Sequence, residues 1–343
     1  MTPRFPVDAL LTWFRANARV LPWREHRTPY RVWLSEIMLQ QTRAEAVVPY
    51  FERFLAALPD IRALAEADEE PLLKLWEGLG YYSRVRNLRK AARLIAARHN
   101  GEFPSGFADI RALPGIGDYT AGAIASIAFG QPAPAVDGNV LRVLSRFQES
   151  RLDVAKQKTR QMFTEQLRRI YPKGHCGDFT ESLMELGATV CLPNGEPLCN
   201  LCPLASACLA HRNGSWRELP VKAEKKPRRI EKRTVLLIHH DGRIALRRRP
   251  RRGLLAGMME FPNLEGWLSK EAVLEHLEEC GASVTGIRAG IEAKHIFSHV
   301  EWLMHGFSVI CSVAPEGFEW VSTAELHERI PLPSAFSAFS GRL

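Results

Sequence analysis

Residues 113–130 read "LPGIGDYTAGAIASIAFG", and this stretch decides the fold of the first half of the chain. Gly115 and Gly117 permit a tight turn, and the alanine-rich run that follows has the composition of a helix. A turn at a helix start leaves backbone amides free, and anions bind at such places. The stretch predicts either a hairpin between helices that grips a DNA phosphate or an ordinary helix–helix turn.

An acidic residue, Asp137, follows this turn along the chain, in "AVDGNVLRVLSR" (135–146). Asp137 comes after a loop with two prolines and directly before a helix. It is a candidate helix N-cap. The alternative interpretation is a carboxylate held on a rigid turn toward a substrate, and the short spacing from the turn at 113–117 favours this second interpretation.

A second acid lies in "VWLSEIMLQQT" (32–42), which reads as one apolar helix with Glu36 in its middle. The apolar side chains around it are too many for a surface helix. Burial in such a setting favours the neutral form of a carboxyl group and raises its pKa. A carboxyl group at position 36 therefore indicates a chemical role rather than a surface charge.

Four of the seven cysteines crowd into "CLPNGEPLCNLCPLASAC" (191–208). Their spacing is C-x7-C-x2-C-x5-C, formed by Cys191, Cys199, Cys202 and Cys208. Four thiolates on one short loop suit a tetrahedral metal or an iron–sulfur cluster, and the spacing alone leaves a structural zinc site open. Structural disulfides are not expected in a chain of cytosolic character.

The composition is that of a globular protein: 343 residues, 46% hydrophobic, with a formal net charge of +8. A basic balance favours a polyanionic partner, although a basic surface without function gives the same number. No apolar run is long enough to cross a membrane, and the N-terminus does not have the pattern of a signal peptide. A cytoplasmic, nucleoid-associated protein without membrane contact is expected.

The helical periodicity changes once along the chain. Amphipathic windows recur at 6–17, 29–57, 71–79, 83–99, 118–129, 139–147, 156–170 and 178–190. They predict an all-α domain over residues 1–215, followed by a basic linker over 216–232. Strand-like runs joined by an Asp241-Gly242 turn come next, with helices at 268–280 and 323–330. Residues 233–343 are therefore expected to form a smaller α+β domain.

Taken together, "RVLPWR", "SEIMLQQT", "VVPYFERF", "GLGYYSR", "PGIGDYTAGAI", "VDGNVLRVLSR" and the four cysteines resemble the adenine DNA glycosylases of the MutY family, in the same order. These belong to the helix-hairpin-helix glycosylase superfamily. The resemblance covers residues 1–210 and implies an all-α catalytic domain that ends in one [4Fe-4S] cluster. The first cysteine spacing is one residue longer than usual for the family. The cluster loop also lacks the basic residues that touch phosphate in relatives.

The resemblance also implies roles for single residues. Glu36 protonates the departing adenine, and Asp137 stabilises the oxocarbenium ion or a covalent intermediate, with Tyr119 and Asn139 orienting both. The adenine pocket is formed by Arg19, Leu21, Trp23, Arg24 and Glu181. DNA contacts come from the wedge residues Gln41 and Tyr81, from Thr42 near the opposite base, and from Leu113, Gly115 and Gly117 of the hairpin.

Tyr119 stands where strand-nicking relatives carry a lysine that forms a Schiff base with the sugar. A tyrosine cannot form that imine. Strand nicking is therefore expected to be weak or absent, and simple hydrolysis of the N-glycosyl bond is expected instead.

The C-terminal half resembles the Nudix-like domain of the same family. Its "HIFSH" (295–299) resembles the loop that recognises 8-oxoguanine, which assigns that role to Phe297, Ser298 and His299; the simpler interpretation is a strand end. Hydrolysis of nucleotides is not expected. Three glutamates of "LEHLEECG" match the Nudix spacing, but Leu274 replaces the arginine and the upstream positions do not match.

The expected substrate is duplex DNA in which adenine faces 8-oxoguanine or guanine, acted on by a monomer. Two other interpretations remain. A DNA-binding or redox-sensing protein would need the hairpin and the cysteines but neither acid. A glycosylase for thymine or oxidised pyrimidines would leave "FSH" and the second domain unexplained.

Overall fold

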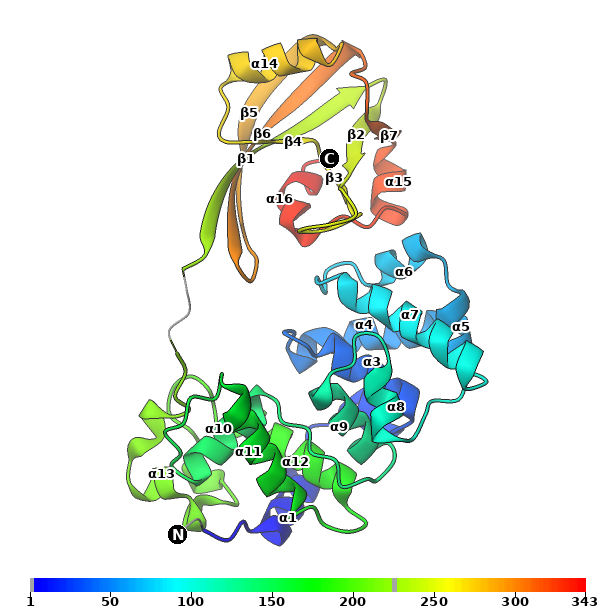
Figure 1. Cartoon of the computed structure of the whole chain (residues 1–343). Helices are drawn as coiled ribbons and strands as arrows, with labels where there is room; N and C mark the ends of the chain where they lie inside the picture. The colour runs from blue at the N-terminus through cyan, green and yellow to red at the C-terminus, as the bar shows by residue number, and fades with distance from the viewer. Residues whose placement is uncertain (1–2, 224–226) are drawn as a thin grey trace. The chain divides into compact units, whose positions relative to one another are not determined.

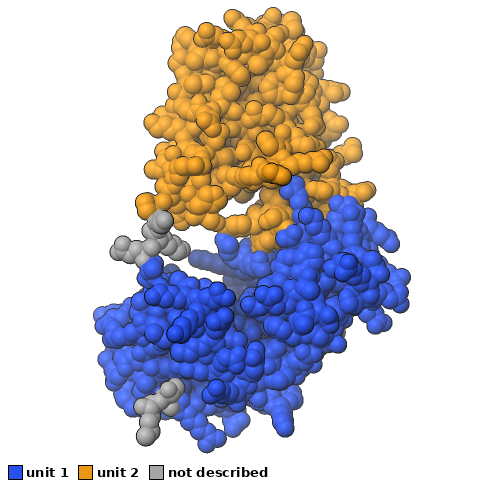
Figure 2. Space-filling view, in the orientation of Figure 1, with its two compact units in different colours: residues 1–67, 86–224 blue, residues 68–85, 225–343 orange. Residues whose placement is uncertain are grey.

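The computed structural model describes residues 3–223 and 227–343. The chain divides into two compact units, which Figure 2 shows in different colours. One unit joins residues 1–67 to 86–224, and the other joins 68–85 to 225–343. Among the described residues, no helix has both the length and the apolar character needed to cross a bilayer.

The first unit is helical (Figure 1). Its longer helices are α1 (Val7–Asn17), α3 (Pro29–Met38), α4 (Ala44–Ala57), α5 (Ile61–Glu66), α7 (Ser83–Arg98), α8 (Phe107–Ala112), α9 (Asp118–Ile127), α10 (Gly138–Phe147), α11 (Gln157–Arg168) and α12 (Cys176–Thr189). Two single turns, α2 (Pro22–Glu25) and α13 (Leu209–Arg212), complete it. Helices α1, α10, α11 and α12 share one core around Phe147, Phe163 and Phe179.

The window at 29–57 contains two helices rather than one. Helix α3 begins after Thr28, whose side chain accepts a hydrogen bond from the amide of Arg31, and it ends at Met38. Helix α4 begins at Ala44. Between them the backbone of Gln41 is left-handed, with φ 65°, which a helix cannot contain. Gln41 and Thr42 therefore lie in a turn and not on the helix that carries Glu36.

The second unit is built on a seven-stranded sheet with the order β3-β2-β1-β6-β5, to which β4 and β7 are added on β1 and β2. The strands are β1 (Arg229–His240), β2 (Arg243–Arg248), β3 (Met259–Glu260), β4 (Asn263–Glu265), β5 (Ser283–Ile296), β6 (Val300–Val313) and β7 (Glu319–Val321). Strands β1 and β6 run parallel, and β5 and β6 form a long antiparallel hairpin.

Each face of this sheet carries its own core. Helix α14 (Lys270–Glu279) covers one face, where Leu236, Ile238 and Phe307 are buried. Helices α15 (Thr323–Glu328) and α16 (Ser337–Ser340) lie on the other side (Figure 1), where Trp302 and Phe336 are buried. The alternation along β1 and β6 supplies both cores, as expected for a sheet covered on both sides. The Asp241-Gly242 turn has positive φ at both residues, as a two-residue hairpin needs.

The linker prediction needs correction at its end. Strand β1 already begins at Arg229, where it pairs with Val300, so residues 229–232 are strand. Three positions of the predicted linker, 224–226, lie outside the described residues. The short strands β4 and β7 were not predicted, because two or three residues carry no measurable alternation.

Residues 68–85 group with the sheet, although the sequence placed them in the first domain. They include α6 (Glu69–Leu75), which packs against the C-terminal segment. Glu77 accepts a hydrogen bond from the amide of Leu332 at 2.8 Å, and Lys74 donates to the carbonyl of Ile330 at 3.2 Å. Contacts between residues about 255 positions apart leave no local signal in the sequence.

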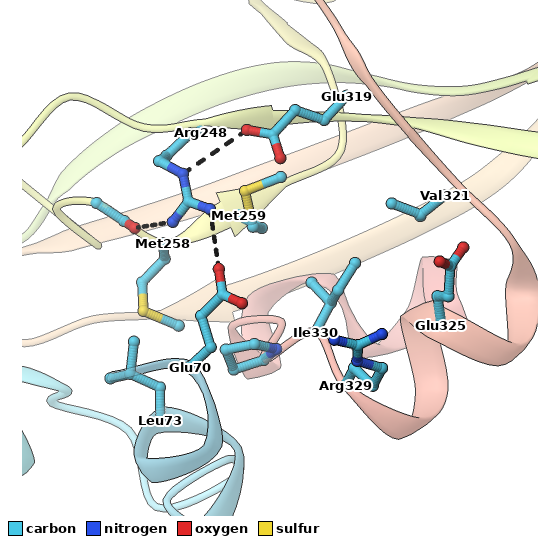
Figure 3. A pocket seen from close by; sticks show the side chains of 12 residues that line it. Glu70, Leu73, Arg248, Met258, Met259, Glu319, Val321, Glu325, Arg329 and Ile330 are labelled. Atoms are coloured by element: carbon cyan, nitrogen blue, oxygen red, sulfur yellow. Dashed lines mark hydrogen bonds and ion pairs between the residues drawn. The ribbon is translucent and has the colours of Figure 1, made fainter. Parts of the chain in front are cut away.

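A pocket of about 210 Å³ lies between α6 and the sheet (Figure 3). Arg248 is one of its lining residues and lies between two acids, 3.3 Å from a carboxylate oxygen of Glu70 and 3.7 Å from one of Glu319. All three side chains are about half exposed or more, so these pairs contribute little to stability. They do satisfy the charges where α6 meets the sheet.

Candidate active site

Glu36 is buried, with 6% of its surface exposed, among Trp33, Leu34, Ile37 and Met38 of α3. The hydroxyl of Tyr119 on α9 donates a hydrogen bond to Glu36 Oε2 at 2.5 Å. The two helices thus bring together two residues that the sequence singled out 83 positions apart. The other carboxylate oxygen of Glu36 remains available for a proton.

Burial raises the pKa of Glu36 to about 7. The hydrogen bond from Tyr119 opposes this rise, and so does the charge of Arg24, while the carboxylates of Asp137 and Glu181 add to it. A carboxyl group with this pKa is protonated in a large fraction of molecules near neutral pH. Glu36 is therefore suited to donate a proton at neutral pH.

Asp137 is the N-cap of α10, and it also faces Glu36 closely enough to raise the pKa of that group. Its Oδ1 accepts a hydrogen bond from the amide of Val140 at 2.7 Å, and its Oδ2 accepts one from Asn139 Nδ2 at 2.8 Å. Burial raises the pKa of Asp137, whereas these bonds and the charge of Arg142 oppose the rise. The N-cap interpretation from the sequence is confirmed, and the same carboxylate also lies near Glu36; its role as a site carboxylate stays a prediction.

Asn139 is held in turn by Arg142, whose Nη2 donates to Asn139 Oδ1 at 2.8 Å. The same guanidinium donates to the backbone carbonyls of Gly187 and Cys191. The amide group of Asn139 is therefore oriented with its nitrogen toward Asp137. This chain of contacts links the carboxylate to the helix α12 and to the start of the cysteine loop.

Of the residues predicted to hold adenine, Arg24 and Glu181 lie beside Glu36 and affect its pKa. Arg24 Nε is buried and has no hydrogen-bond acceptor among the described residues; it lies 3.4 Å from Glu181 Oε1. Leu21 and Trp23 are buried, and the Trp23 ring packs edge-on against Phe51. Arg24 Nε–H thus lies beside the Glu181 carboxylate as an ion pair without forming a close hydrogen bond to it.

Three charged residues of this cluster were not predicted from the sequence: Arg27, Asp178 and Glu185. Asp178, Glu181 and Glu185 repeat every three or four residues and so share one face of α12. Each pairs with an arginine from residues 19–27: Arg27 with Asp178 at 2.7 Å, Arg24 with Glu181, and Arg19 with Glu185 at 2.8 Å. That spacing was the available signal, since acids on one face of an otherwise apolar helix need partners.

The predicted hairpin lies between α8 and α9. Gly115 has φ +79°, and a Cβ added there would lie 2.7 Å from Asn87 Cβ, so only glycine fits. Gly117 has an extended backbone, φ −99°, and a Cβ added there would meet no atom within 4 Å. Leu113 is buried, and its carbonyl accepts the amide of Ile116 to close the turn. One glycine therefore serves the turn, and the other leaves an open surface at the start of α9.

Gln41 and Tyr81, the two predicted wedge residues, both have positive φ, 65° and 48°. Positive φ is uncommon for residues other than glycine, and such strain gathers at functional sites. Tyr81 belongs to the second unit and is 45% exposed. Thr42 follows Gln41 in the turn between α3 and α4 and is partly exposed.

Residues 297–299 form the tip of the β5–β6 hairpin, so "FSH" is a turn at a strand end. The Phe297 ring packs against Trp302 with centroids 5.0 Å apart. The Ser298 hydroxyl is 2.8 Å from the Tyr81 hydroxyl, and His299 is exposed. The structure thus joins Tyr81 to Ser298, a pairing that the sequence analysis did not anticipate.

The four cysteines of the C-terminal loop line one small cavity together with Arg146 and Trp216. Arg146 Nη1 donates a hydrogen bond to Cys191 Sγ at 3.4 Å. In the described part of the chain, no group of three or more His, Cys, Asp or Glu side chains is spaced closely enough to hold a single metal ion. Four thiols around one cavity with a guanidinium beside them are compatible with an iron–sulfur cluster.

The family model for HhH-GPD superfamily base excision DNA repair proteins matches residues 34–172, and the NUDIX domain model matches 233–340. An adenine DNA glycosylase of Buchnera aphidicola (subsp. Schizaphis graminum) is 34% identical, covering 84% of this chain and 83% of that protein. The human adenine DNA glycosylase is 33% identical, covering 93% of this chain and 70% of that protein.

Two solved structures resemble the helical unit. A thermostable thymine-DNA glycosylase has a TM-score of 0.55 and 28% identity, covering 60% of this chain and 95% of that one. Endonuclease III in a non-covalent complex with DNA has a TM-score of 0.52 and 25% identity, covering 61% and 94%.

Proposed function

Since the chain belongs to the adenine DNA glycosylase family, as an adenine-specific DNA N-glycosylase of base excision repair, we propose that it removes adenine paired with 8-oxoguanine, or with guanine, in duplex DNA. The observation that carries the catalytic part is the buried Glu36, whose pKa is raised to about 7. Residues 1–215 carry out the chemistry and residues 233–343 inspect the opposite base. The enzyme acts as a monomer, with the nucleoid in the cytoplasm.

Adenine inside a duplex is out of reach, so the nucleotide must leave the base stack, at a cost of a few kcal/mol. Gln41 and Tyr81 are proposed to enter the duplex at the gap, and Thr42 to lie near the opposite base. Their positive φ angles support this, because such strained backbone at residues other than glycine gathers at functional sites. The hairpin of Leu113, Gly115 and Gly117 grips a phosphate, independently of base sequence.

Glu36 is the proposed general acid. The adenine anion is a poor leaving group, and protonation of its N7 makes the carbon–nitrogen bond breakable. Tyr119 donates to Oε2 of Glu36, which leaves Oε1 to carry the proton toward the base. The apolar surroundings in α3 keep the acid partly protonated at neutral pH.

Asp137 is the proposed partner for the positive charge that builds on the sugar as adenine departs. It must be ionised for this, and the donors from Val140 and Asn139 stabilise the charged form against burial. It stabilises the oxocarbenium ion directly or adds to it as a nucleophile. Tyr119 cannot form a Schiff base, so strand nicking should be weak or absent.

Arg24 and Glu181 are the proposed polar contacts for adenine. The Arg24 Nε–H suits a ring nitrogen acceptor, and a carboxylate suits the exocyclic amine. The rest of the proposed adenine pocket is formed by Arg19, Leu21 and Trp23. A buried donor that a substrate satisfies gives selectivity as well as affinity.

Recognition of 8-oxoguanine is assigned to Phe297, Ser298 and His299. The contact between Ser298 and Tyr81 supports this, because it places the reading loop beside a wedge residue. Ser298 supplies a hydroxyl that donates and accepts, and His299 reaches a phosphate or a base edge.

The four cysteines are proposed to hold one [4Fe-4S] cluster, Cys191, Cys199, Cys202 and Cys208 each binding one iron. Bound there, the cluster would cross-link the cysteine segment 191–208 to itself, and this segment contacts α10 through hydrogen bonds between Arg146 and both Cys191 and Cys208. Arg146 would offset its negative charge. Iron and acid-labile sulfide in equal amounts in the purified protein would support the assignment, whereas zinc without sulfide would contradict it.

The substrate is tested by base release from four duplexes that carry A:8-oxoguanine, A:G, A:T and G:T pairs. Free adenine should appear fastest from A:8-oxoguanine, more slowly from A:G, and not from A:T. Release of thymine from G:T, with none of adenine, would overturn the proposal in favour of a thymine-removing enzyme.

A further inference from the structure

Glu185 lies one turn beyond Glu181 on α12, outside the group of residues expected to touch adenine. Its side chain is 1% exposed. It accepts hydrogen bonds from three nitrogens of Arg19, namely the backbone amide at 3.1 Å, Nε at 2.8 Å and Nη2 at 3.0 Å. It accepts a fourth from Arg24 Nη2 at 2.9 Å. A single carboxylate thus ties together both arginines of the proposed pocket.

Arg24 is fully oriented by this arrangement. Its Nη2 bonds Glu185, its Nη1 donates to the carbonyl of Arg19 at 3.0 Å, and its guanidinium lies over the Phe14 ring. The remaining Nε–H then points toward Glu181 Oε1 at 3.4 Å. Without Glu185, two long side chains would be free to choose other partners, since each carries rotamer entropy.

Glu185 is ionised near neutral pH. Burial alone would raise its pKa, but hydrogen bonds from Arg19 and Arg24 more than offset burial and lower the pKa to about 2. At every pH where the enzyme can work, this carboxylate therefore cancels part of the positive charge of Arg24. Removing one partner of such a buried pair leaves the other charge uncompensated.

Four groups face Glu36 from the elements packed against it: Tyr119 from α9, Asp137 before α10, Glu181 from α12 and Arg24 from α2. Arg24 is the cation of this set, and its charge favours the ionised form of Glu36. Whatever neutralises or holds back Arg24 therefore helps to keep Glu36 protonated.

We propose that Glu185 is a positioning residue for the glycosylase reaction, holding Arg24 toward Glu181 and away from full electrostatic contact with Glu36. This inference rests on the proposed role of Glu36 as the acid. Glu185 does not touch the substrate; it acts through Arg24. Its loss lowers the pKa of Glu36 by two routes: the charge of Arg24 is no longer partly cancelled and its guanidinium is free to approach Glu36, and one buried negative charge disappears.

The test is the pH profile of single-turnover adenine release by the holoenzyme carrying Glu185→Gln. Below the midpoint of the wild-type profile the variant should stay within a few-fold of wild type. Above it the variant should be slower by about tenfold, because a shift of about one pH unit in the midpoint changes the protonated fraction by that factor. Glu185→Asp, which keeps the charge, should have an intermediate midpoint.

Glu45→Gln is the matched control. Glu45 also pairs with Arg19, at 2.8 Å, but it is 71% exposed and does not contact Arg24. This variant should keep the wild-type midpoint. It therefore separates loss of a carboxylate on Arg19 from loss of the constraint on Arg24.

Two results would overturn the inference: an equal loss of rate at every pH with an unchanged midpoint in Glu185→Gln, or a profile identical to wild type. If Glu185→Gln fails to fold, an unshifted midpoint in Glu185→Asp would contradict it as well. Failure of the proposed function is distinguishable, because the wild-type rate would then show no dependence on a group with a pKa near 7.

Discussion

Glu36 and Asp137 are both buried carboxylates, and their hydrogen-bond partners separate their tasks. Among the described residues, Glu36 accepts one hydrogen bond, from Tyr119; apolar side chains of α3 surround it, and Arg24 is the cation that acts on its charge. Asp137 accepts a backbone amide and a side-chain amide, and Arg142 stands behind it. More donors stabilise a charge, and fewer leave the neutral acid favoured. At the residue scale, the division of roles follows from this difference in donors.

The pH dependence follows directly from the pKa of Glu36. The acid must be protonated to act, and its pKa lies at about 7. We expect the single-turnover rate constant to be nearly level below that value and to fall about tenfold for each pH unit above it. The rate constant should also fall at acid pH, where Asp137 takes up a proton, so the pH profile is bell-shaped.

Removing the Tyr119 hydroxyl should move this midpoint upward. The bond from Tyr119 favours the ionised form of Glu36, so Tyr119→Phe raises the pKa of the acid further. The descending limb of the pH profile should then begin at a higher pH than in wild type. A midpoint that moves downward would contradict the assigned direction of the hydrogen bond.

Much of this site could be predicted from the residues, because an acid in an apolar helix and an aspartate before a helix are local patterns. The pairing of the arginines with acids of α12 could not be predicted in this way. Arg19 and Glu185 lie 166 positions apart, and only the packing of α12 beside the segment 19–27 brings them together. The pairing of Tyr81 with Ser298 escaped for the same reason.

At the scale of elements, the hairpin between α8 and α9 is the part whose backbone is most strictly determined. Gly115 has a conformation and a neighbour that exclude a side chain, whereas Gly117 has neither restriction. Its open surface at the start of α9 is the side on which a phosphate could approach.

Two alanine substitutions separate these roles. Gly115→Ala should lower the free energy of unfolding by about 1–3 kcal/mol, since it combines positive φ with a clash against Asn87. Gly117→Ala should leave the melting temperature nearly unchanged and weaken binding to any duplex, with a smaller salt dependence. Thermal melts and binding at several salt concentrations measure both. Equal melts with unchanged DNA binding for both variants would contradict the assignment.

Element types were predictable where their period was long, as in α7, α10 and the β5–β6 hairpin. The break inside 29–57 was not, because Leu39, Gln40 and Gln41 contain no proline or glycine to signal it. Left-handed backbone at a glutamine is imposed by the surrounding structure and not by its own preference.

At the scale of the whole molecule, residues 68–85 carry Tyr81 and group with the sheet that carries Ser298. Two segments far apart in sequence, residues 68–85 and the β5–β6 turn at 297–299, are therefore parts of the same unit. The hydroxyl contact between Tyr81 and Ser298 joins the proposed wedge residue to the loop proposed to recognise 8-oxoguanine. Recognition and insertion are therefore expected to depend on each other.

Tyr81→Phe tests that dependence, since it keeps the ring and removes the bond to Ser298. We expect the ratio of adenine release from A:8-oxoguanine over A:G to fall several-fold, as it should for Ser298→Ala. Tyr82→Phe is the control: its hydroxyl bonds the Leu332 carbonyl in the same unit, so it should change stability and not the ratio. An unchanged ratio in Tyr81→Phe would show that the contact plays no part in recognition.

The central claim, that the buried acid of α3 drives adenine release, is tested most directly by one comparison. Single-turnover release of adenine from an A:8-oxoguanine duplex is measured at neutral pH for the intact chain and for Glu36→Gln, with duplex binding measured in parallel. We expect the rate of Glu36→Gln to be lower by about 10²–10⁴-fold, with duplex binding within a few-fold of wild type, because general acid catalysis contributes on that order. A Glu36→Gln variant that releases adenine at nearly the wild-type rate would contradict it.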